Sequence, residues 1–389
     1  MGVPFMRVAY VSTYPPTPCG IAEYTTDLIK SIKNLANLDV LVLADGVTNH
    51  DLSYKEVAIV SAFFPGKPSY GRLLKVARDY GPFDILHIQH EYGLFPPRNE
   101  FLNVLKELRR YCNALVVTLH TVYHAVRGYE LVKHQKMLGE LVDAIIVHSA
   151  LMEYELWNQG VSLSKIHLIP HGTPLNDLAV SKEAALRELG LSELSDKFIF
   201  ATVGFIRRDK GLDTLLEAFQ KVRSKHSNAV LIIAGVPQDK EGIEHARELG
   251  KLAKELPALD GGNVIEVRKY LTRRELTLLI KASDLIVLPY RDDLGVFGVS
   301  GMLHVVMGCF KPVICSRTPR LVECSALIPE VTVTPNDAGE LAEKMIYAIE
   351  NYSEFLELCR PLFDLAVRSS WRNVARKHLM LYEKVLSSK

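Results

Sequence analysis

The sequence predicts an α/β protein with two doubly wound, Rossmann-like domains, each built on a parallel sheet. The chain has 389 residues, which is too many for one ordinary core and favours two domains. Short apolar runs alternate with amphipathic helical windows, a pattern typical of parallel strands covered by helices on both faces. Because such sheets bind ligands beyond the carboxyl ends of their strands, we expect the site in a cleft between the two domains.

The first series of strands predicts a domain over residues 1–172. Amphipathic windows that separate several of these strands lie at 21–34, 100–111 and 129–141. The predicted strands themselves cover 6–12, 38–43, 57–63, 84–89, 114–120, 143–149 and 165–170.

A second series begins after the loop HGTPLND and predicts a domain over residues 173–368. Its strands are expected at 197–204, 229–235, 263–267, 284–290, 311–315 and 331–334. Its helical windows lie at 211–224, 240–255, 272–281 and 336–350. The amphipathic window 369–389 is expected to form a last helix that crosses back to the first domain.

The composition argues against several classes of function. With 46 basic and 45 acidic residues, the net charge of +1 gives no electrostatic reason to expect nucleic acid as a partner. The six cysteines form no CxxC pair and no Cys/His ligand spacing, so we expect no metal site, no disulfide framework and a reducing, cytoplasmic location. We also recognise no signal peptide and no apolar run of the roughly 18 residues that cross a membrane.

A weak peripheral contact with a membrane stays open as an alternative. The window 101–113 combines an apolar and a basic face, as a helix that lies on a membrane surface does. A helix that covers a sheet has the same pattern and is the more frequent explanation.

The stretch from Leu288 to Cys315, LPYRDDLGVFGVSGMLHVVMGCFKPVIC, has the layout of an anion site. An apolar strand ends near Tyr290, a glycine-rich loop follows, and a helix is expected to start near Ser300. This arrangement aims backbone N–H groups and a helix dipole at an anion. We therefore expect four residues of the loop to hold a phosphate, namely Gly298, Val299, Ser300 and Gly301.

Two other loops at predicted strand ends suit a phosphate. In STYPPTPCGIAEYT, Gly20 precedes a helix and lets the backbone approach a ligand, although a tight turn explains it equally well. In VGFIRRDKGLDTLLEAF, Arg207, Arg208 and Lys210 follow a strand, where clustered cations suit a diphosphate. Taken alone, such a cluster is more often a solvated loop. No GxGxxG or P-loop motif occurs, which argues against a dinucleotide enzyme and a P-loop NTPase.

Polar residues also end two strands of the first domain. Gln89, His90 and Glu91 follow one apolar run, and His120 follows the next. Substrate-handling groups belong at this end of a parallel sheet. A single histidine is more often structural, but two neighbouring strands that end in histidine favour a functional role.

Taken together, these segments resemble a GT-B fold retaining glycosyltransferase of family 4, over nearly the whole chain. The resemblance rests on the order and spacing of PPTPCGIAEYT, HIQHEYGLF, VTLHTVY, IPHGTP, VGFIRRDKGLDTLLEAF, YLTRRELTLLIKASDLIVLPYRDD, SGMLHVVMGCFKPVI and SWRNVARKHLMLYE. It implies that the first domain receives the acceptor and that the second binds a nucleotide diphosphate sugar.

The same resemblance implies a role for several residues. His120 matches the cleft histidine near the transferred sugar, and Lys210 matches the lysine that binds the diphosphate. Gly20 matches a glycine near the distal phosphate. Tyr270 and Leu271 fall where the family holds the nucleobase, and the expected acceptor side consists of Tyr24, Gln89, His90 and Glu91.

The chain departs from the family pattern at two places. Phe205 stands where the family carries an arginine, so Arg207 or Arg208 is expected to supply the second cation. The family's two glutamates would fall at Phe297 and Val305, and neither position carries one. Other groups must therefore replace the charge-assisted contacts that those glutamates make with the donor. From this segment, we expect the backbone amides of the loop to bind the donor phosphate.

The resulting prediction is a hexosyltransferase-type enzyme. It is expected to move a sugar from a nucleotide diphosphate sugar to a hydroxyl of a glycan, a glycolipid or a small sugar, with a carbohydrate or lipid-linked acceptor as partner. We expect retention of the anomeric configuration, no metal and no other cofactor. Two alternatives stay open: a non-catalytic homologue that binds a sugar nucleotide or glycan, and a nucleotide-sugar hydrolase, epimerase or phosphorylase on the same fold.

Overall fold

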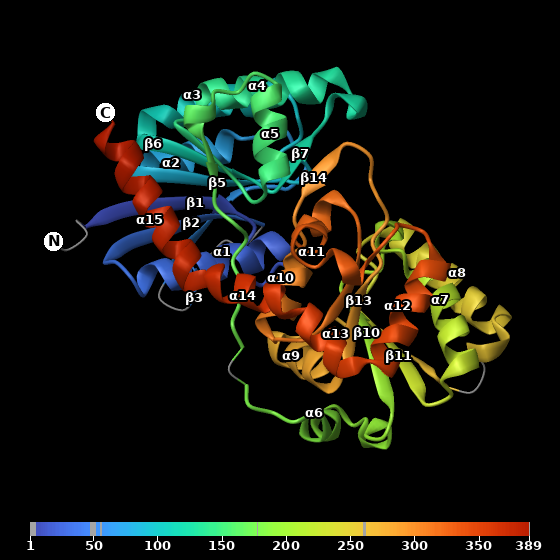
Figure 1. Ribbon diagram of the computed structural model, residues 1–389. Coiled ribbons are helices and arrows are strands. Elements are labelled where there is room, and N and C mark those ends of the chain that lie inside the picture. The colour runs from blue at the N-terminus through green and yellow to red at the C-terminus, as the bar shows by residue number, and fades with distance from the viewer. Residues whose placement is uncertain (1–4, 47–51, 55–56, 177, 260–261, 389) are drawn as a thin grey trace. The chain divides into compact units, whose positions relative to one another are not determined.

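The computed structural model describes residues 5–46, 52–54, 57–176, 178–259 and 262–388. It divides into two compact α/β units, which are coloured by residue number in Figure 1. Unit 1 consists of Met1–Gly172, Leu294–Val299 and Ser369–Lys389, and unit 2 of Thr173–Asp293 and Ser300–Arg368. Each unit contains one large, mainly parallel sheet, so the predicted fold class of two doubly wound domains is confirmed.

Unit 1 is built on a sheet in the order β3-β4-β2-β1-β5-β6-β8-β9. Every neighbouring pair is parallel except β3 and β4. The strands are β1 (Met6–Ser12), β2 (Leu38–Asp45), β3 (Leu52–Tyr54), β4 (Val57–Phe63), β5 (Phe83–His90), β6 (Cys112–Leu119), β8 (Ala144–Val147) and β9 (Ile166–Leu168).

Helices cover both faces of this sheet, because successive side chains of each strand point to opposite faces. On one face lie α2 (Gly71–Tyr80), α3 (Asn99–Leu108), α4 (Tyr129–Leu141) and α5 (Ala150–Asn158). On the other face, α1 (Gly20–Lys33) packs against α15 (Trp371–Ser387). The ring of Trp371 lies against Gly172, where a Cβ atom would meet it at 2.2 Å. The last helix thereby joins the core of unit 1.

Helix α3 accounts for most of the window considered for membrane contact. Its apolar side chains are buried against the sheet: Phe101, Leu102, Val104, Leu105 and Leu108. The apolar face of this window is therefore a core face, and the more frequent explanation of its pattern is the correct one. Within the described part of the chain, no helix combines the length and the apolarity needed to cross a bilayer.

Unit 2 is built on a six-stranded parallel sheet in the order β12-β11-β10-β13-β15-β16. Its strands are β10 (Phe198–Val203), β11 (Ala229–Ala234), β12 (Val264–Val267), β13 (Leu285–Leu288), β15 (Val313–Ser316) and β16 (Thr332–Val333). Its helices are α6 (Lys182–Leu189), α7 (Leu212–Lys225), α8 (Lys240–Glu255), α9 (Arg273–Ala282), α10 (Gly301–Gly308), α11 (Val322–Leu327), α12 (Ala338–Glu350), α13 (Tyr352–Leu358) and α14 (Arg360–Arg368).

Side-chain caps fix where several helices of unit 2 begin. Thr272 and Glu275 form a capping box at the start of α9. Asp337 accepts hydrogen bonds from two backbone N–H groups at the start of α12, and Ser300 accepts one at the start of α10. The cap at Ser300 confirms the helix start that the sequence predicts there.

A short antiparallel pair was not anticipated. Strand β7 (Thr121–Tyr123) pairs with β14 (Val296–Gly298), so Gly298 lies opposite Thr121. Its backbone packs closely here, since a Cβ atom on Gly298 would lie 3.0 Å from the carbonyl oxygen of His120. Six residues of the glycine-rich loop therefore belong to unit 1.

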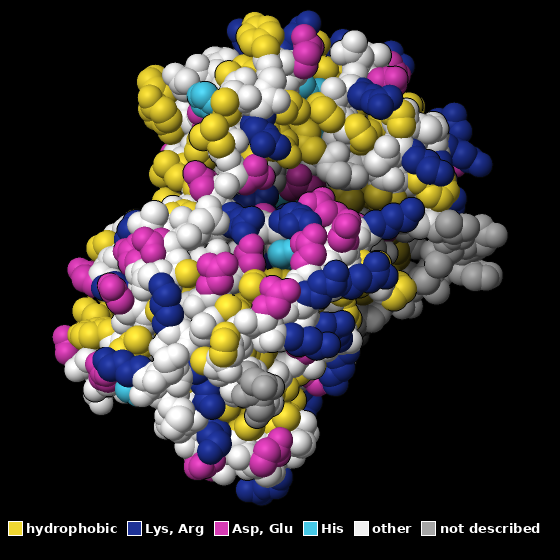
Figure 2. Space-filling view, turned by 90° about the vertical axis from the view of Figure 1, so that its right-hand side faces the viewer, with side chains coloured by type: hydrophobic (Ala, Val, Ile, Leu, Met, Phe, Trp, Pro, Cys, Tyr) yellow, Lys and Arg dark blue, Asp and Glu magenta, His cyan; other side chains and the backbone are white. Residues whose placement is uncertain are grey.

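Charged side chains of both signs are distributed over the surface. Figure 2 shows lysines and arginines interspersed with aspartates and glutamates on the face that it draws. This pattern accords with the near-zero net charge of the chain.

Candidate functional site

The loop after β10 positions Lys210 against an aromatic ring. The loop ends at Gly211, whose φ of 63° is left-handed and whose Cβ atom, if it had one, would lie 1.9 Å from the carbonyl oxygen of Pro289. This close approach brings the loop to the carboxyl end of β13. The ammonium nitrogen of Lys210 lies 3.7 Å from the centroid of the Tyr290 ring, in cation–π contact.

The two arginines of this loop are engaged by carboxylates. Arg207 donates from Nε and Nη2 to the two oxygens of Asp209, both at 2.8 Å. Arg208 pairs with Glu248 at 2.9 Å and with Glu241 at 3.5 Å. Both glutamates belong to α8, so Arg208 is directed toward that helix. Both arginines thus have carboxylate partners, whereas Lys210 contacts an aromatic ring.

The start of α10 lies beside Tyr290. The hydroxyl of Tyr290 is 3.1 Å from the hydroxyl of Ser300, which accepts a hydrogen bond from the N–H group of Leu303. Gly301 is the first residue of the helix. The first N–H groups of a helix and the positive end of its dipole favour an anion, and Lys210 reaches the same tyrosine. A cation and a helix start therefore meet around one ring.

The structure divides the four residues predicted to hold a phosphate. Ser300 and Gly301 cap and begin α10 in unit 2. Gly298 is paired in β14, and Val299 is the last residue of that segment of unit 1. The backbone of Gly298 is engaged with Thr121, so we retain only Ser300 and Gly301 beside Lys210.

The residues expected at the nucleobase include an exposed aromatic ring. Tyr270 is 48% exposed, and its ring centroid lies 6.3 Å from that of Phe205. Leu271 is half-buried and packs on the core of unit 2. The phenylalanine that replaces the family's arginine thus adds a second ring beside Tyr270. Aromatic faces of this kind suit a flat, polarisable ligand.

In unit 1, His120 is held by a buried amide. Its Nε2 atom lies 2.9 Å from Oε1 of Gln89, and because a carbonyl oxygen only accepts, Nε2 carries the hydrogen. Burial, followed by the proximity of His148 and His90, lowers the pKa of His120 well below its ordinary value. His120 is therefore a neutral imidazole at neutral pH, with Nδ1 as its acceptor.

Gln89 is the end of a buried polar chain that reaches α15. Its Nε2 atom lies 3.3 Å from Nε2 of His87, which lies 2.8 Å from the hydroxyl of Thr118. Nδ1 of His87 is 2.6 Å from the hydroxyl of Tyr382, and this hydroxyl is 2.9 Å from that of Tyr10. Such a network fixes ring orientations when each member has a partner.

Gly20 and Tyr24 both lie on α1. Gly20 is its first residue, and a Cβ atom there would meet nothing within 4 Å. The side chain of Tyr24 is only 2% exposed, and its ring packs edge-on against His120 at 4.9 Å. Among the described residues, the Tyr24 hydroxyl has no hydrogen-bond partner. Tyr24 is therefore a buried residue that packs against the ring of His120, and its side chain is not exposed for contact with an acceptor.

Glu91 is held at the edge of β7. Thr121 donates its hydroxyl hydrogen to Oε2 at 2.7 Å, and the N–H group of Tyr92 donates to Oε1 at 2.9 Å. Glu91 is half-buried, so its carboxylate keeps a limited access to solvent. Of the predicted acceptor-side residues, it is the one with a fixed, charged and partly accessible group.

His90 is not at the acceptor side, which corrects the prediction. It follows Gln89 in β5, and because strand side chains alternate, its ring points to the opposite face of the sheet. There it is fully buried and packs on Phe95 and Phe101, with ring centroids 5.9 and 5.2 Å away. Neither ring nitrogen has a hydrogen-bond partner among the described residues. His90 is a core residue.

Comparison with protein families accounts for both units. Residues 18–177 match Glycosyltransferase Family 4, and residues 197–351 match Glycosyl transferases group 1. The two matches follow one another and together span most of both units. The chain belongs to the GT-B glycosyltransferases.

Solved structures share the fold of this glycosyltransferase. HepE from Anabaena, in complex with UDP and glucose, is 16% identical with a TM-score of 0.72, and the alignment covers 99% of this chain and 100% of HepE. Sucrose-phosphate synthase from Thermosynechococcus elongatus is 19% identical with a TM-score of 0.77 and the same coverage. A trehalose-6-phosphate structure from E. coli, bound with UDP-2-fluoro glucose, is 13% identical with a TM-score of 0.73, covering 97% and 98%. A comparison with curated protein sequences found no match.

Sequence reasoning missed part of the glycosyltransferase's polar structure around α10. His304 on this helix lies 2.8 Å from the hydroxyl of Thr173 through Nδ1 and 3.5 Å from Glu323 through Nε2. Glu323 follows β15, so a carboxylate does approach α10, although the helix carries none at position 305. No local pattern could reveal this pair, because its members come from separate helices, α10 and α11. The contacts of Tyr290 with Lys210 and Ser300 were not predicted, although its position at the end of an apolar strand is where site residues are expected.

The buried histidines predict acid sensitivity of unit 1, and His90 provides the test. Burial, followed by the proximity of His134, lowers the pKa of His90 to about 3. The ordinary pKa of histidine is near 6.5. Between about pH 6.5 and about pH 3, this histidine is therefore protonated in the unfolded chain and neutral in the folded protein. The stabilising effect of a neutral His90 is therefore complete above about pH 6.5 and is lost as the pH falls.

We expect His90→Phe to weaken this dependence. An apolar ring of similar shape needs no proton, so the variant should lose about 2 kcal/mol less unfolding free energy than the wild type between about pH 7.5 and about pH 5. Urea unfolding followed by tryptophan fluorescence measures this in unit 1, because both tryptophans, Trp157 and Trp371, lie there. Parallel pH profiles of the two proteins would contradict the assignment.

Proposed function

We propose that the protein transfers a hexosyl group from a nucleotide diphosphate sugar to a hydroxyl acceptor, with retention of the anomeric configuration and without a metal. The observation that carries the proposal is the convergence of Lys210 and the capped start of α10 on Tyr290 in unit 2. A cation and free helix N–H groups at one place suit a diphosphate that gains negative charge as it departs.

The donor is proposed to bind to unit 2. Lys210, Ser300 and Gly301 face the diphosphate, and the rings of Phe205 and Tyr270 offer a stacking surface for the nucleobase. HepE, which shares the fold, was crystallised with UDP-glucose. UDP-glucose is therefore the first donor to test.

The proposed step breaks the bond between the anomeric carbon and the distal phosphate oxygen. The electron pair stays on that oxygen, and the acceptor oxygen forms its bond on the same face of the carbon. The released phosphate takes the proton of the acceptor hydroxyl, so the step is balanced without a protein base. The transition state resembles an oxocarbenium ion, and the positive charge of Lys210 stabilises the leaving group.

The acceptor is proposed to bind to unit 1. His120, in the same unit, is a neutral imidazole of fixed orientation, and its Nδ1 is proposed to accept a hydrogen bond from a hydroxyl of the transferred sugar. Glu91, held by Thr121, provides a carboxylate that accepts from hydroxyls of a glycan, a glycolipid or a small sugar. These groups orient sugars, and none of them needs to change its protonation state.

The direct test is product formation from a panel of donors. The protein is incubated with UDP-, GDP- and ADP-hexoses, with and without hydroxyl acceptors, and the released nucleotide diphosphate is measured. Acceptor-dependent release, a product with the donor's anomeric configuration and insensitivity to EDTA support the proposal. Binding without turnover across the panel would indicate a non-catalytic homologue, and release of free sugar without an acceptor a hydrolase.

A further inference from the structure

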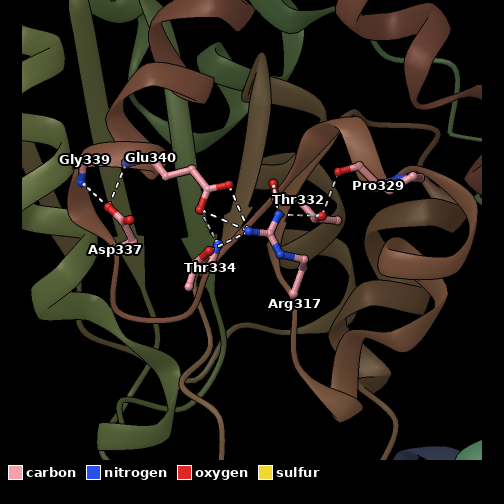
Figure 3. A network of polar contacts seen from close by, with 7 residues as sticks. All are labelled: Arg317, Pro329, Thr332, Thr334, Asp337, Gly339 and Glu340. Atoms are coloured by element: carbon pink, nitrogen blue, oxygen red, sulfur yellow. Dashed lines mark hydrogen bonds and ion pairs between the residues drawn. The ribbon is translucent and has the colours of Figure 1, made fainter.

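Two arginines in the loop after β15 differ sharply in their surroundings. Arg317 donates to Glu340 at 3.0 and 3.2 Å, to Thr334 at 2.5 Å and to the carbonyl oxygen of Thr332 at 3.1 Å. Figure 3 shows this network, in which the guanidinium is hydrogen-bonded to Thr332 of β16, to Thr334 and to Glu340 of α12. The charge of Arg317 is therefore used in holding unit 2 together.

Arg320 lies three residues further on and makes no comparable contact. Its guanidinium has no ion pair or hydrogen bond with any residue that the structure describes. Its backbone is nevertheless fixed, because its carbonyl oxygen accepts a hydrogen bond of 2.9 Å from the N–H group of Ser300. Arg320 is thus tied to the residue that caps α10 and carries a positive charge without a carboxylate partner.

The charge of Arg320 reaches the loop of Lys210. Burial alone would raise the pKa of Asp209, but the charges of Lys210 and Arg207, the hydrogen bonds from Arg207, and the charge of Arg320 hold it below its ordinary value. The charge of Arg320 thus acts on Asp209, the residue before Lys210. Two strand-end loops, after β10 and after β15, each bring one cation to the start of α10.

Lys210 and Arg320 are not neutralised by a directly bonded carboxylate among the described residues. Asp209 receives both of its short hydrogen bonds from Arg207, so these two charges offset one another. Lys210 contacts an aromatic ring, and neither Lys210 nor Arg320 forms an ion pair with a carboxylate among the described residues. The hydroxyl of Thr318, in the same loop as Arg320, is also buried without a hydrogen-bond partner among the described residues.

We propose that Arg320, together with Lys210, binds the diphosphate of the donor, in the role that the sequence predicted for Arg207 or Arg208. The inference rests on the proposed function, since it names the second cation of that donor site. A diphosphate carries more negative charge than one lysine can match, and a planar guanidinium can donate to two phosphate oxygens at once. Arg320 would then replace the arginine that is absent at Phe205.

The test compares binding of nucleoside diphosphates and monophosphates by calorimetry. UDP, GDP and ADP are titrated into the wild type, and the tightest of them is used together with its monophosphate. We expect Arg320→Gln to raise the Kd of the diphosphate about tenfold, equivalent to ~1.4 kcal/mol, and that of the monophosphate less than about twofold. A general distortion of the loop would weaken both ligands alike. Arg320→Lys should recover part of the loss, because it restores the charge without the planar fork.

Arg317→Gln is the matched control. It removes an equal charge from the same loop, so it should lower the melting temperature while leaving the Kd of the diphosphate within about twofold. An unchanged diphosphate Kd in Arg320→Gln, or equal losses for diphosphate and monophosphate, would overturn the assignment of Arg320. If the wild type binds none of the three diphosphates, the proposed function fails and this inference fails with it.

Discussion

Replacing Lys210 by alanine is expected to lower kcat/KM for the sugar donor by about 10²- to 10³-fold. The ammonium group of Lys210 lies over Tyr290, whose hydroxyl contacts the Ser300 cap of α10, so it is held where the departing diphosphate gains charge. A preorganised cation there contributes more in the transition state than in the ground state. The loss should therefore appear in kcat as well as in KM.

Variants at the same position separate charge from packing. Lys210→Met keeps an unbranched stem over the ring but removes the charge, and it should lose as much activity as alanine. Lys210→Arg keeps the charge and should retain more activity. Lys221→Ala, an exposed change on α7, serves as the control for a lost lysine. Melting temperatures are measured throughout, because loss of the cation–π contact also costs stability, on the order of 1 kcal/mol. Wild-type kcat/KM in Lys210→Met would remove Lys210 from the mechanism.

The sequence predicted the long strands well because burial dictates their composition. β1 and β4 occupy the predicted residues 6–12 and 57–63, and both are almost wholly buried. The pair β7 and β14 escaped prediction because three-residue strands carry no period of their own. Their pairing depends on contacts between residues about 175 positions apart along the chain.

The candidate site was predicted in its outline but not in its partners. The loops with Lys210 and Ser300 follow from strand ends and a helix start, which are local signals. The carboxylate that engages Arg208 belongs to another helix, and no local pattern distinguishes an engaged arginine from an available one. His90 is different, because its alternation with Gln89 along the predicted strand could have placed it on the opposite face of the sheet.

Much of the buried polar structure in unit 1 is explained by one requirement, the orientation of His120. An unpaired polar nitrogen of a buried imidazole costs free energy, so a hydrogen bond to the ring of His120 favours one orientation and one tautomer. Gln89 provides that bond and is itself linked through His87 to Tyr382 on α15. The polar chain thus extends from His120 to the last helix, and Gln89 is the member that contacts His120 directly.

We expect Gln89→Leu to reduce kcat about 10- to 100-fold, in line with the roughly 1–3 kcal/mol that an unsatisfied buried group costs. Leucine has a similar volume but cannot accept from Nε2 of His120, so the ring loses the contact that defines its orientation and its acceptor nitrogen. Donor binding should change little, because the diphosphate site lies on unit 2. Steady-state kinetics at saturating donor measure the effect.

Tyr382→Phe is the informative comparison for this prediction. It removes a hydroxyl from the far end of the same chain and leaves His87 and Tyr10 without that partner. It should therefore lower the unfolding free energy by about 1–3 kcal/mol while kcat stays within about threefold of the wild type. Equal losses of kcat in the two variants would mean that activity follows stability alone. A small effect of Gln89→Leu would mean that the orientation of His120 does not control the transfer step.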